Sequence, residues 1–274
     1  MNLTIYCEGT KRSHDYNLIH KIVKDKPVQI QPIGSKRGAE SFIEDCENKK
    51  VVADAFIFFR DRDFDVAVPE KPSLIKDGST FYSYRTTIEN YLFDAHCFFA
   101  FLQNKKLNRQ YKIHSPNEVQ NTFIKAAKKI SYYQALRHTI AQMRESTDLP
   151  TTWIKGNSGS LPYPLDDKVR YRQKALDKVK ETSTRTEVLT EEMFDATFEA
   201  FCTRFDTEDF YLASQYLIWF QGKDFAKSLS LTLPQFPMVQ YYKFAKQYFD
   251  YKQFEDLVEL REIIDINSVQ KQLP

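Results

Sequence analysis

The sequence feature that most constrains the fold is an apolar run that ends in three carboxylates at alternate positions. Residues 56–59 read Phe-Ile-Phe-Phe, and Asp61, Asp63 and Asp65 follow shortly after. Such a run is typical of a strand buried on both faces. Because side chains alternate along a strand, the three aspartates would share one side if the extended conformation continued past the run. Three neighbouring carboxylates repel one another, and a hard cation such as Mg²⁺ or Mn²⁺ relieves that repulsion.

The patterns around this run predict an α/β fold in two parts. Strands are expected over residues 3–7, 28–33, 51–59 and 81–85, and helices over residues 14–24 and 39–49. This succession predicts a small parallel sheet flanked by helices, in an N-terminal domain over residues 1–95. Residues 96–274 have a mainly helical pattern, which includes apolar positions at a period of 3.6 residues over residues 117–145. We expect this helical domain to serve substrate binding, partner docking or dimerisation.

Polar residues follow several of the predicted strands directly. Glu8 follows the first strand, the turn 34–38 the second, Asp61 and Asp63 the third, and Glu89 comes shortly after the fourth. Sites in parallel sheets form where the carboxyl ends of the strands meet. The sequence therefore predicts a cation site at this edge of the sheet. The plainer alternative is a solvated acidic turn after a core strand.

Charge is distributed unevenly along the chain, although its net charge is only +2. Residues 105–185 hold 17 Lys and Arg against 7 Asp and Glu, whereas residues 186–274 hold 8 against 15. A basic region beside an acidic site suits a protein that binds a phosphate backbone. The predicted contacts lie on a basic helix over residues 166–181; they are Lys168, Arg170, Arg172, Lys174 and Lys178. The alternative is that this helix is simply a solvated surface.

Several other site classes are excluded by their spacing. An EF-hand loop beginning at Asp61 would need Gly at its sixth position and Glu at its twelfth, where this chain has Val66 and Pro72. Gly222-Lys223 is followed by Asp224 and not by a hydroxyl residue, so there is no phosphate-binding loop of the nucleotide-hydrolysing type. A haloacid-dehalogenase phosphatase is also disfavoured, because Phe64 stands where a Thr or Ser is expected.

The cysteines and the hydropathy pattern point to a cytoplasmic protein. The four cysteines are scattered without Cys-x-x-Cys spacing, which indicates neither a zinc site nor a disulfide framework. The five histidines are unclustered, so each is expected to be a surface or core residue. No apolar run approaches the roughly 20 residues of a membrane span, and the N-terminus does not read as a signal peptide. We therefore expect no membrane association.

Glu8-Gly9 after the first strand and Asp61-Arg-Asp63 after the third form a more specific combination than either motif alone. Together they resemble the TOPRIM domain of topoisomerases, primases and OLD-type nucleases, over roughly residues 1–95. The resemblance implies that Glu8 acts as general acid or base and as a metal ligand, while Asp61 and Asp63 bind Mg²⁺. A topoisomerase or primase fragment is a weaker alternative, because the chain has neither a recognisable catalytic-tyrosine domain nor a zinc-binding cysteine pattern.

A narrower resemblance rests on Phe59-Arg-Asp-Arg-Asp63, Ile88-Glu-Asn-Tyr-Leu92 and Gly222-Lys223. These segments look like the AriB-type effectors of bacterial PARIS anti-phage systems. The resemblance implies a toxic nuclease of abortive infection that cleaves RNA such as tRNA, or else DNA. It also implies an AriA-like ABC-type ATPase as the partner that restrains it, and a homodimer as the active form. The turn 34–38 has fewer glycines than relatives commonly show.

Each residue of the expected site can be assigned a role. Glu8, Asp61 and Asp63 would hold Mg²⁺ or Mn²⁺, and Glu89 and Asp65 would complete a second metal position. Lys36, as a catalytic group, and Arg37 would contact phosphate from the turn after the second strand. Arg60 and Arg62 alternate with the aspartates, so they are expected to point the other way and to serve as scaffold or partner contacts. The alternatives are a non-catalytic TOPRIM-like scaffold that docks on an ATPase and binds nucleic acid, and a DNA-directed OLD-like nuclease.

Overall fold

The computed structural model describes residues 3–34, 41–43, 45–46, 56–64, 66–143, 167–182 and 190–269. The chain forms two compact units. Unit 1 comprises Met1–Asp63, Val68–Leu92 and Tyr242–Pro274, and unit 2 comprises Phe64–Ala67 and Phe93–Tyr241. Each unit is described by itself below.

Unit 1 is built on a five-stranded sheet in the order β2-β1-β3-β5-β4. Its strands are β1 (Thr4–Cys7), β2 (Gln29–Pro32), β3 (Phe56–Arg60), β4 (Ile75–Asp77) and β5 (Thr80–Tyr82). The first three and β5 run parallel, whereas β4 is antiparallel to β5 at the edge. The predicted α/β fold is thereby confirmed. The edge strand β4 was not predicted, because its three residues, Ile-Lys-Asp, carry too little apolar pattern to register as a strand.

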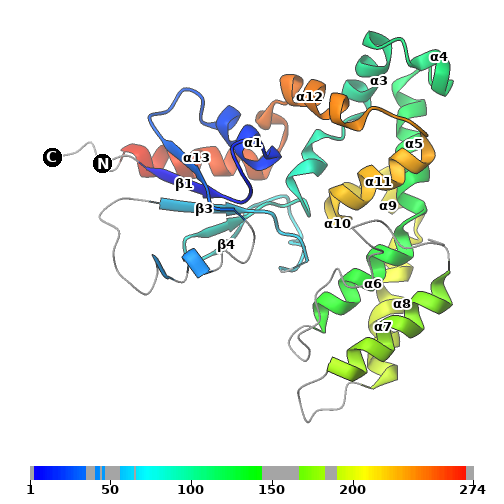
Figure 1. Ribbon diagram of the computed structural model, residues 1–274. Coiled ribbons are helices and arrows are strands. Elements are labelled where there is room, and N and C mark those ends of the chain that lie inside the picture. The colour runs from blue at the N-terminus through cyan, green and yellow to red at the C-terminus, as the bar shows by residue number, and fades with distance from the viewer. Residues whose placement is uncertain are drawn as a thin grey trace. The chain divides into compact units, whose positions relative to one another are not determined.

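Helices cover both faces of this sheet (Figure 1). Helix α1 (His14–Ile22) begins at Ser13, whose side chain accepts a hydrogen bond from the Tyr16 amide, and it buries Leu18, Ile19 and Ile22. Helix α13 (Glu255–Val269) lies on the same face as α1. On the opposite face, residues 41–43 and 45–46 are helical, as predicted, and the Phe42 ring packs against Tyr6 and Phe58.

The C-terminal segment belongs to the sheet unit, which differs from the predicted division at residue 95. Unit 1 includes the end of α12 (Met238–Tyr248), the 3-10 turn η4 (Tyr251–Gln253) and α13. Leu257, Leu260 and Ile264 of α13 are fully buried. The predicted helical character of this segment is correct, but its helix completes the core of the N-terminal unit because the short sheet needs a second helix on that face.

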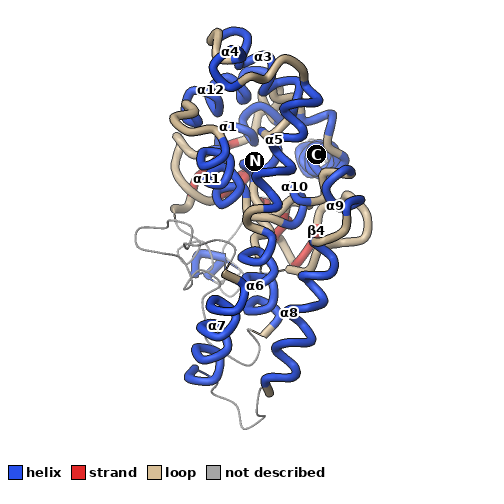
Figure 2. Tube along the Cα trace, turned by 90° about the vertical axis from the view of Figure 1, so that its right-hand side faces the viewer, coloured by secondary structure: helices blue, strands red, loops and turns tan. Residues whose placement is uncertain are grey.

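Unit 2 is helical, as predicted, and Figure 2 shows α6, α7 and α8 side by side in it. Its helices are α3 (Ala95–Asn104), α4 (Asn108–Tyr111), α5 (Pro116–Lys128), α6 (Ser131–Gln142), α7 (Lys168–Thr182), α8 (Glu191–Phe205), α9 (Glu208–Leu212), α10 (Tyr216–Trp219), α11 (Gly222–Thr232) and the start of α12. Phe98, Phe123 and Phe225 pack together edge to face in its core. Across the described residues of both units, no helix is long and apolar enough to cross a membrane.

The helical pattern predicted over residues 117–145 is divided between two helices in the described part of this range. The chain leaves helical geometry at Ile130, whose φ and ψ are −113° and 6°. Helix α5 packs on α3 and α11, whereas α6 packs on α7 and α8. A continuous apolar period of 3.6 residues passes through both helices, so periodicity alone cannot locate the break. The break lets the two segments pack against different neighbours.

Candidate functional site

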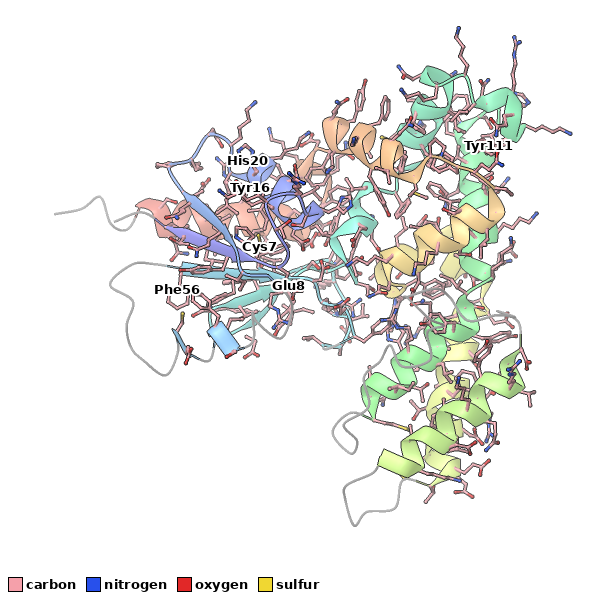
Figure 3. The ribbon with its side chains drawn as sticks, in the orientation of Figure 1. Cys7, Glu8, Tyr16, His20, Phe56 and Tyr111 are labelled. Carbon is pink, nitrogen blue, oxygen red and sulfur yellow. The ribbon has the colours of Figure 1, made fainter. Side chains whose placement is uncertain are left out.

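The end of β1 is shaped by a glycine that no other residue could replace without strain. Gly9 has a φ of +85° and exchanges backbone hydrogen bonds with Gly34, with N···O distances of 2.6 and 3.1 Å. A Cβ on Gly9 would lie 2.6 Å from the Cβ of Ser13, which is closer than real side chains approach. The Glu8-Gly9 pair therefore places a carboxylate at the strand end and turns the chain toward Ser13, the cap of α1. Figure 3 shows Glu8 at this end of β1.

The chain turns directly after β3. The strand ends at Arg60, and Asp63 has a φ of +48°, in the left-handed region that aspartate tolerates. The condition under which Asp61 and Asp63 would share one side, an extended conformation that continues past the strand, is therefore not met. The Asp63 amide donates to the Thr86 carbonyl at 2.7 Å, and Asp61 Oδ1 accepts from the Ile88 amide at 2.7 Å. Both residues thus hold the segment that leads into η1 (Ile88–Leu92).

Carboxylates nevertheless gather here, as predicted from the strand ends. Burial raises the pKa of Asp61 well above its usual range, and the charges of Asp15, Glu89, Asp63 and Glu8 raise it further. We call these five residues the acidic edge: Glu8, Asp15, Asp61, Asp63 and Glu89. Neighbouring strands β1 and β3 have their onward connections on opposite sides, so Glu8 and Asp61 stand where the strand order reverses. Open parallel sheets bind ligands at that position.

Arg60 pairs with Glu8 and does not point away from it, which corrects the prediction for this arginine. Its Nε lies 2.9 Å from Glu8 Oε1, and the Arg60 residue is only 5% exposed. The register explains the contact: Cys7 stands opposite Phe59, so the next residues, Glu8 and Arg60, also face each other across parallel strands. The Arg60 guanidinium thus already lies beside the Glu8 carboxylate of the acidic edge.

Arg62 has the scaffold role that was predicted for it. It is 1% exposed and donates to the Tyr84 carbonyl at 3.2 Å and to Thr86 Oγ1 at 3.1 Å. It therefore fastens β3 to the segment after β5. Burial lowers the pKa of Arg62 to about 10, which still leaves its guanidinium charged at neutral pH.

The segment that carries Glu89 is fixed by the C-terminal helix. The Tyr91 hydroxyl donates to Asp256 Oδ2 of α13, and that same oxygen accepts from the Tyr84 amide at 3.0 Å. Arg85 lies over the rings of Tyr91 and Phe254, at 5.1 and 4.9 Å from their centroids. Asp256 and Glu89 are 2% and 5% exposed. The position of Glu89 thus depends on residues at the opposite end of the chain.

Three residues at the site were not predicted. Asp15 stands in the first turn of α1, and its place after Glu8-Gly9 and the Ser13 cap was a signal that sequence reasoning could have used. Tyr242 is near Glu89: burial and the Glu89 charge raise the pKa of its phenol. His14, predicted to be a surface or core residue, packs its ring on Tyr242 with centroids 4.6 Å apart. No sequence signal links Tyr242 to a strand end more than 150 residues earlier.

The acidic edge has the donor chemistry of a divalent-cation site but not a closed ligand set. Within the described ranges, no three His, Cys, Asp or Glu side chains are close enough together to hold a metal ion as they stand. The donors are carboxylate oxygens, which Mg²⁺ and Mn²⁺ prefer, and their negative charges add to the burial that raises the pKa of Asp61. The chemistry of the residues therefore fits such a cation. None of the four cysteines, all within the described ranges, forms a disulfide.

Two of the basic residues predicted as contacts on α7 are engaged with α8. Arg172 pairs with Asp195 and, at 2.8 Å, with Glu191, while Lys168 Nζ lies 2.9 Å from Glu199. The two other predicted contacts whose side chains are described, Arg170 and Lys174, are exposed. Much of the positive charge of this helix is thus neutralised within unit 2.

The remaining predicted site residues are not described by the structure. Lys36, Arg37 and Asp65 lie outside the described residues, and the side chain of Lys178 does as well. No protein-family profile matches this chain, and no curated protein matches it either.

Proposed function

We propose that this chain is a Mg²⁺-dependent endonuclease whose reaction takes place at the acidic edge. The observation that carries the proposal is the gathering of carboxylates from β1, α1, β3 and η1 around the buried Asp61. Catalytic sites are where burial and like charges shift pKa values in this way. The resemblance to TOPRIM nucleases, and more narrowly to AriB-type effectors, adds the substrate class: RNA such as tRNA before DNA.

In this mechanism Asp61, Asp63 and Glu8 would hold the cation, with Glu89 and Asp65 beside them. When bound, the cation would neutralise charge at the scissile phosphate and lower the pKa of a water molecule. Glu8 would move a proton, either from the attacking water or to the leaving oxygen. Arg60 orients Glu8 through the Nε–Oε1 contact of 2.9 Å. Tyr91 and Asp256 keep η1, and with it Glu89, in place.

The wider biological role rests on the AriB resemblance. We propose a toxic effector of an anti-phage system that an AriA-like ATPase restrains and that acts as a homodimer. A non-catalytic scaffold is the competing proposal, and the Glu8–Arg60 ion pair is the observation that favours it. An arginine bound to the presumed catalytic carboxylate suits a site that no longer needs that carboxylate for a cation.

The test is cleavage of total tRNA and of plasmid DNA by the purified protein with Mg²⁺. Wild-type protein should cleave, and EDTA should stop it. Glu8→Gln and Asp61→Asn should each lower the rate by about 100-fold or more, since proton transfer alone contributes about 10²–10⁴-fold. Glu70→Gln, which changes an exposed carboxylate in the same unit, is the matched control and should cleave like wild type. Undiminished cleavage by Glu8→Gln would sink this mechanism, and an inert wild type would favour the scaffold.

A further inference from the structure

We infer that α1 and the end of α12 form a binding surface for a single-stranded polynucleotide beside the acidic edge. Its cationic residues are Lys21, Lys24, Lys243 and Lys246, which we call the lysine surface. The inference rests on the proposed function for its biological meaning, but its evidence is the geometry of unit 1. It assigns substrate binding to a different part of the chain from the basic helix α7.

The two helical segments touch each other. Lys21 Nζ donates to the Gln247 carbonyl at 2.9 Å, and the rings of His14 and Tyr242 pack edge to face. All of these residues belong to unit 1. Lysines from both segments therefore belong to one continuous surface, even though more than 200 residues separate them in sequence.

Both segments lead away from the acidic edge. Asp15, which raises the pKa of Asp61, is six residues before Lys21 on α1. Tyr242, which lies near Glu89, is four residues before Lys246 on α12. At 1.5 Å per residue, these separations are about 9 and 6 Å along the helix axes. A polyanion bound by the lysines would thus reach the carboxylates within a few nucleotides.

The four lysines keep their charges without an acidic partner in the part of the chain that the structure describes. Among the described residues, none of the four forms an ion pair, and the charged neighbours that lower the pKa values of Lys21 and Lys246, after burial, are Lys24 and Lys243. The acidic groups that follow α1 are already used: Asp25 pairs with Arg261, and Asp265 with Lys26. Lys243 and Lys246 are three residues apart on α12, and Lys24 follows the end of α1, three residues after Lys21. Like charges at such short spacing repel each other. An anion with several phosphates would relieve that repulsion at both positions.

The aromatic side chains favour nucleic acid over an acidic protein. Tyr248 at the end of α12 is 65% exposed, and its ring packs on Phe244 with centroids 4.6 Å apart. Tyr16 and His20 lie together on α1 (Figure 3). Their ring centroids are 6.2 Å apart; Tyr16 is half-buried and His20 is exposed. Exposed rings among lysines are the usual means of binding unpaired bases, since every base presents a face for stacking. An acidic protein has no bases to stack on these rings.

The experiment is anisotropy of a fluorescent single-stranded 20-nucleotide RNA in EDTA, over a range of salt concentrations. Lys24→Gln/Lys243→Gln/Lys246→Gln should bind at least about tenfold more weakly, and the salt slope should fall by about 2, because each phosphate contact of a single strand contributes about 0.7. Lys21 is kept because it also bonds to α12. The matched control, Lys105→Gln/Lys112→Gln/Lys125→Gln, removes the same charge from exposed positions of unit 2 and should retain affinity and slope.

A second variant separates stacking from charge. Tyr248→Ala should weaken RNA binding by about 5- to 150-fold, the range of one stacked base, while Tyr248→Phe should not. Polyglutamate of equal charge is the competing probe. Three results would each overturn the inference. The first is an unchanged salt slope in the lysine variant, and the second is an equal loss of RNA affinity in the control variant. The third is polyglutamate binding as tight as RNA binding, together with no effect of Tyr248→Ala. Because EDTA removes divalent cations from the assay, these binding results are independent of cleavage. A protein that binds RNA through this surface but does not cleave it would refute the proposed function alone.

Discussion

At the scale of single residues, the side chains of the site are held by partners that are far away in the sequence. Glu8 is paired with Arg60, and Asp61 bonds to the amide before Glu89. Tyr91 is the clearest case, because its hydroxyl bonds to Asp256 and accepts from the Arg85 amide at 3.1 Å. Burial raises the pKa of Asp256. The Tyr91 hydrogen bond opposes that rise, which makes Tyr91 a stabilising donor to a buried carboxylate.

Tyr91→Phe should therefore destabilise the protein. At pH 7 we expect a loss of about 1.5–3 kcal/mol, the usual value for a hydrogen bond to a charged group. The folded-state pKa of Asp256 is above its unfolded value, so its ionisation disfavours folding as the pH rises through that pKa. The penalty of Tyr91→Phe should thus shrink as the pH is lowered through the pKa of Asp256. Urea unfolding at several pH values measures this, with exposed Tyr248→Phe, expected within about 0.5 kcal/mol of wild type, as control. A penalty that does not change with pH would contradict the assignment.

At the scale of elements, helix packing pairs part of the basic region with the acidic region that follows it in sequence. The basic helix α7 is matched by acidic residues of α8, through Arg172 with Asp195 and Glu191 and through Lys168 with Glu199. The pairs on α7 and α8 are exposed and contribute little to stability. A different pair joins α6 to α11: Arg137 and Asp224 are 1% and 0% exposed, with Gln134 bonded to the same carboxylate at 3.0 Å.

Arg137→Met should cost about 3–5 kcal/mol, because it leaves the Asp224 charge buried without its cation. The double variant Arg137→Met/Asp224→Leu should recover much of that loss, since both charges are then removed from the interior. Arg172→Gln is the control of the same residue type in an exposed pair, and it should change stability by less than about 1 kcal/mol. Chemical unfolding followed by far-ultraviolet circular dichroism measures all three. Equal losses for Arg137→Met and Arg172→Gln would show that burial does not govern these pairs.

At the scale of the whole molecule, the N-terminal sheet is completed by the C-terminus. Helix α13 buries three aliphatic side chains fully in the core of the sheet unit. Its Asp256 and Glu259 also bond to residues within 74–91. Arg261 extends this link by bonding to the Ile22 carbonyl and to Asp25 at the end of α1. Each buried aliphatic side chain contributes about 1.5–3 kcal/mol. That is a large part of the stability available to a small domain.

A fragment of residues 1–95 should accordingly not fold cooperatively, although the sequence reads as a domain of that length. Joining residues 242–274 to it through a flexible Gly/Ser linker should restore a cooperative transition, because α13 again covers the sheet. Thermal unfolding followed by circular dichroism distinguishes the two chains. A cooperative transition in the 1–95 fragment alone would mean that α13 is dispensable for unit 1.

The sequence by itself determined the class of the fold and most members of the acidic edge. Strand ends in a parallel sheet must meet at one edge, so Glu8, Asp61 and Glu89 could be placed together from local pattern alone. Strand and helix periodicities are local properties, which is why the order of β1, α1, β2 and β3 was predicted correctly. The end of β3 was predicted to within one residue, but the turn at Asp63 was not predicted, because the spacing of the aspartates gives no sign of their backbone conformation.

Only the tertiary structure decided which partners these residues have. Arg60 faces Glu8 because of strand register, α7 faces α8 because of helix packing, and Tyr242 and Asp256 reach η1 from the other end of the chain. Each of these contacts joins residues that are distant in sequence, and no periodicity records such a pairing. The physical reason is that these residues meet only when the whole core is buried. Burial of the core is a property of the folded chain, so no single segment of the sequence specifies the pairs.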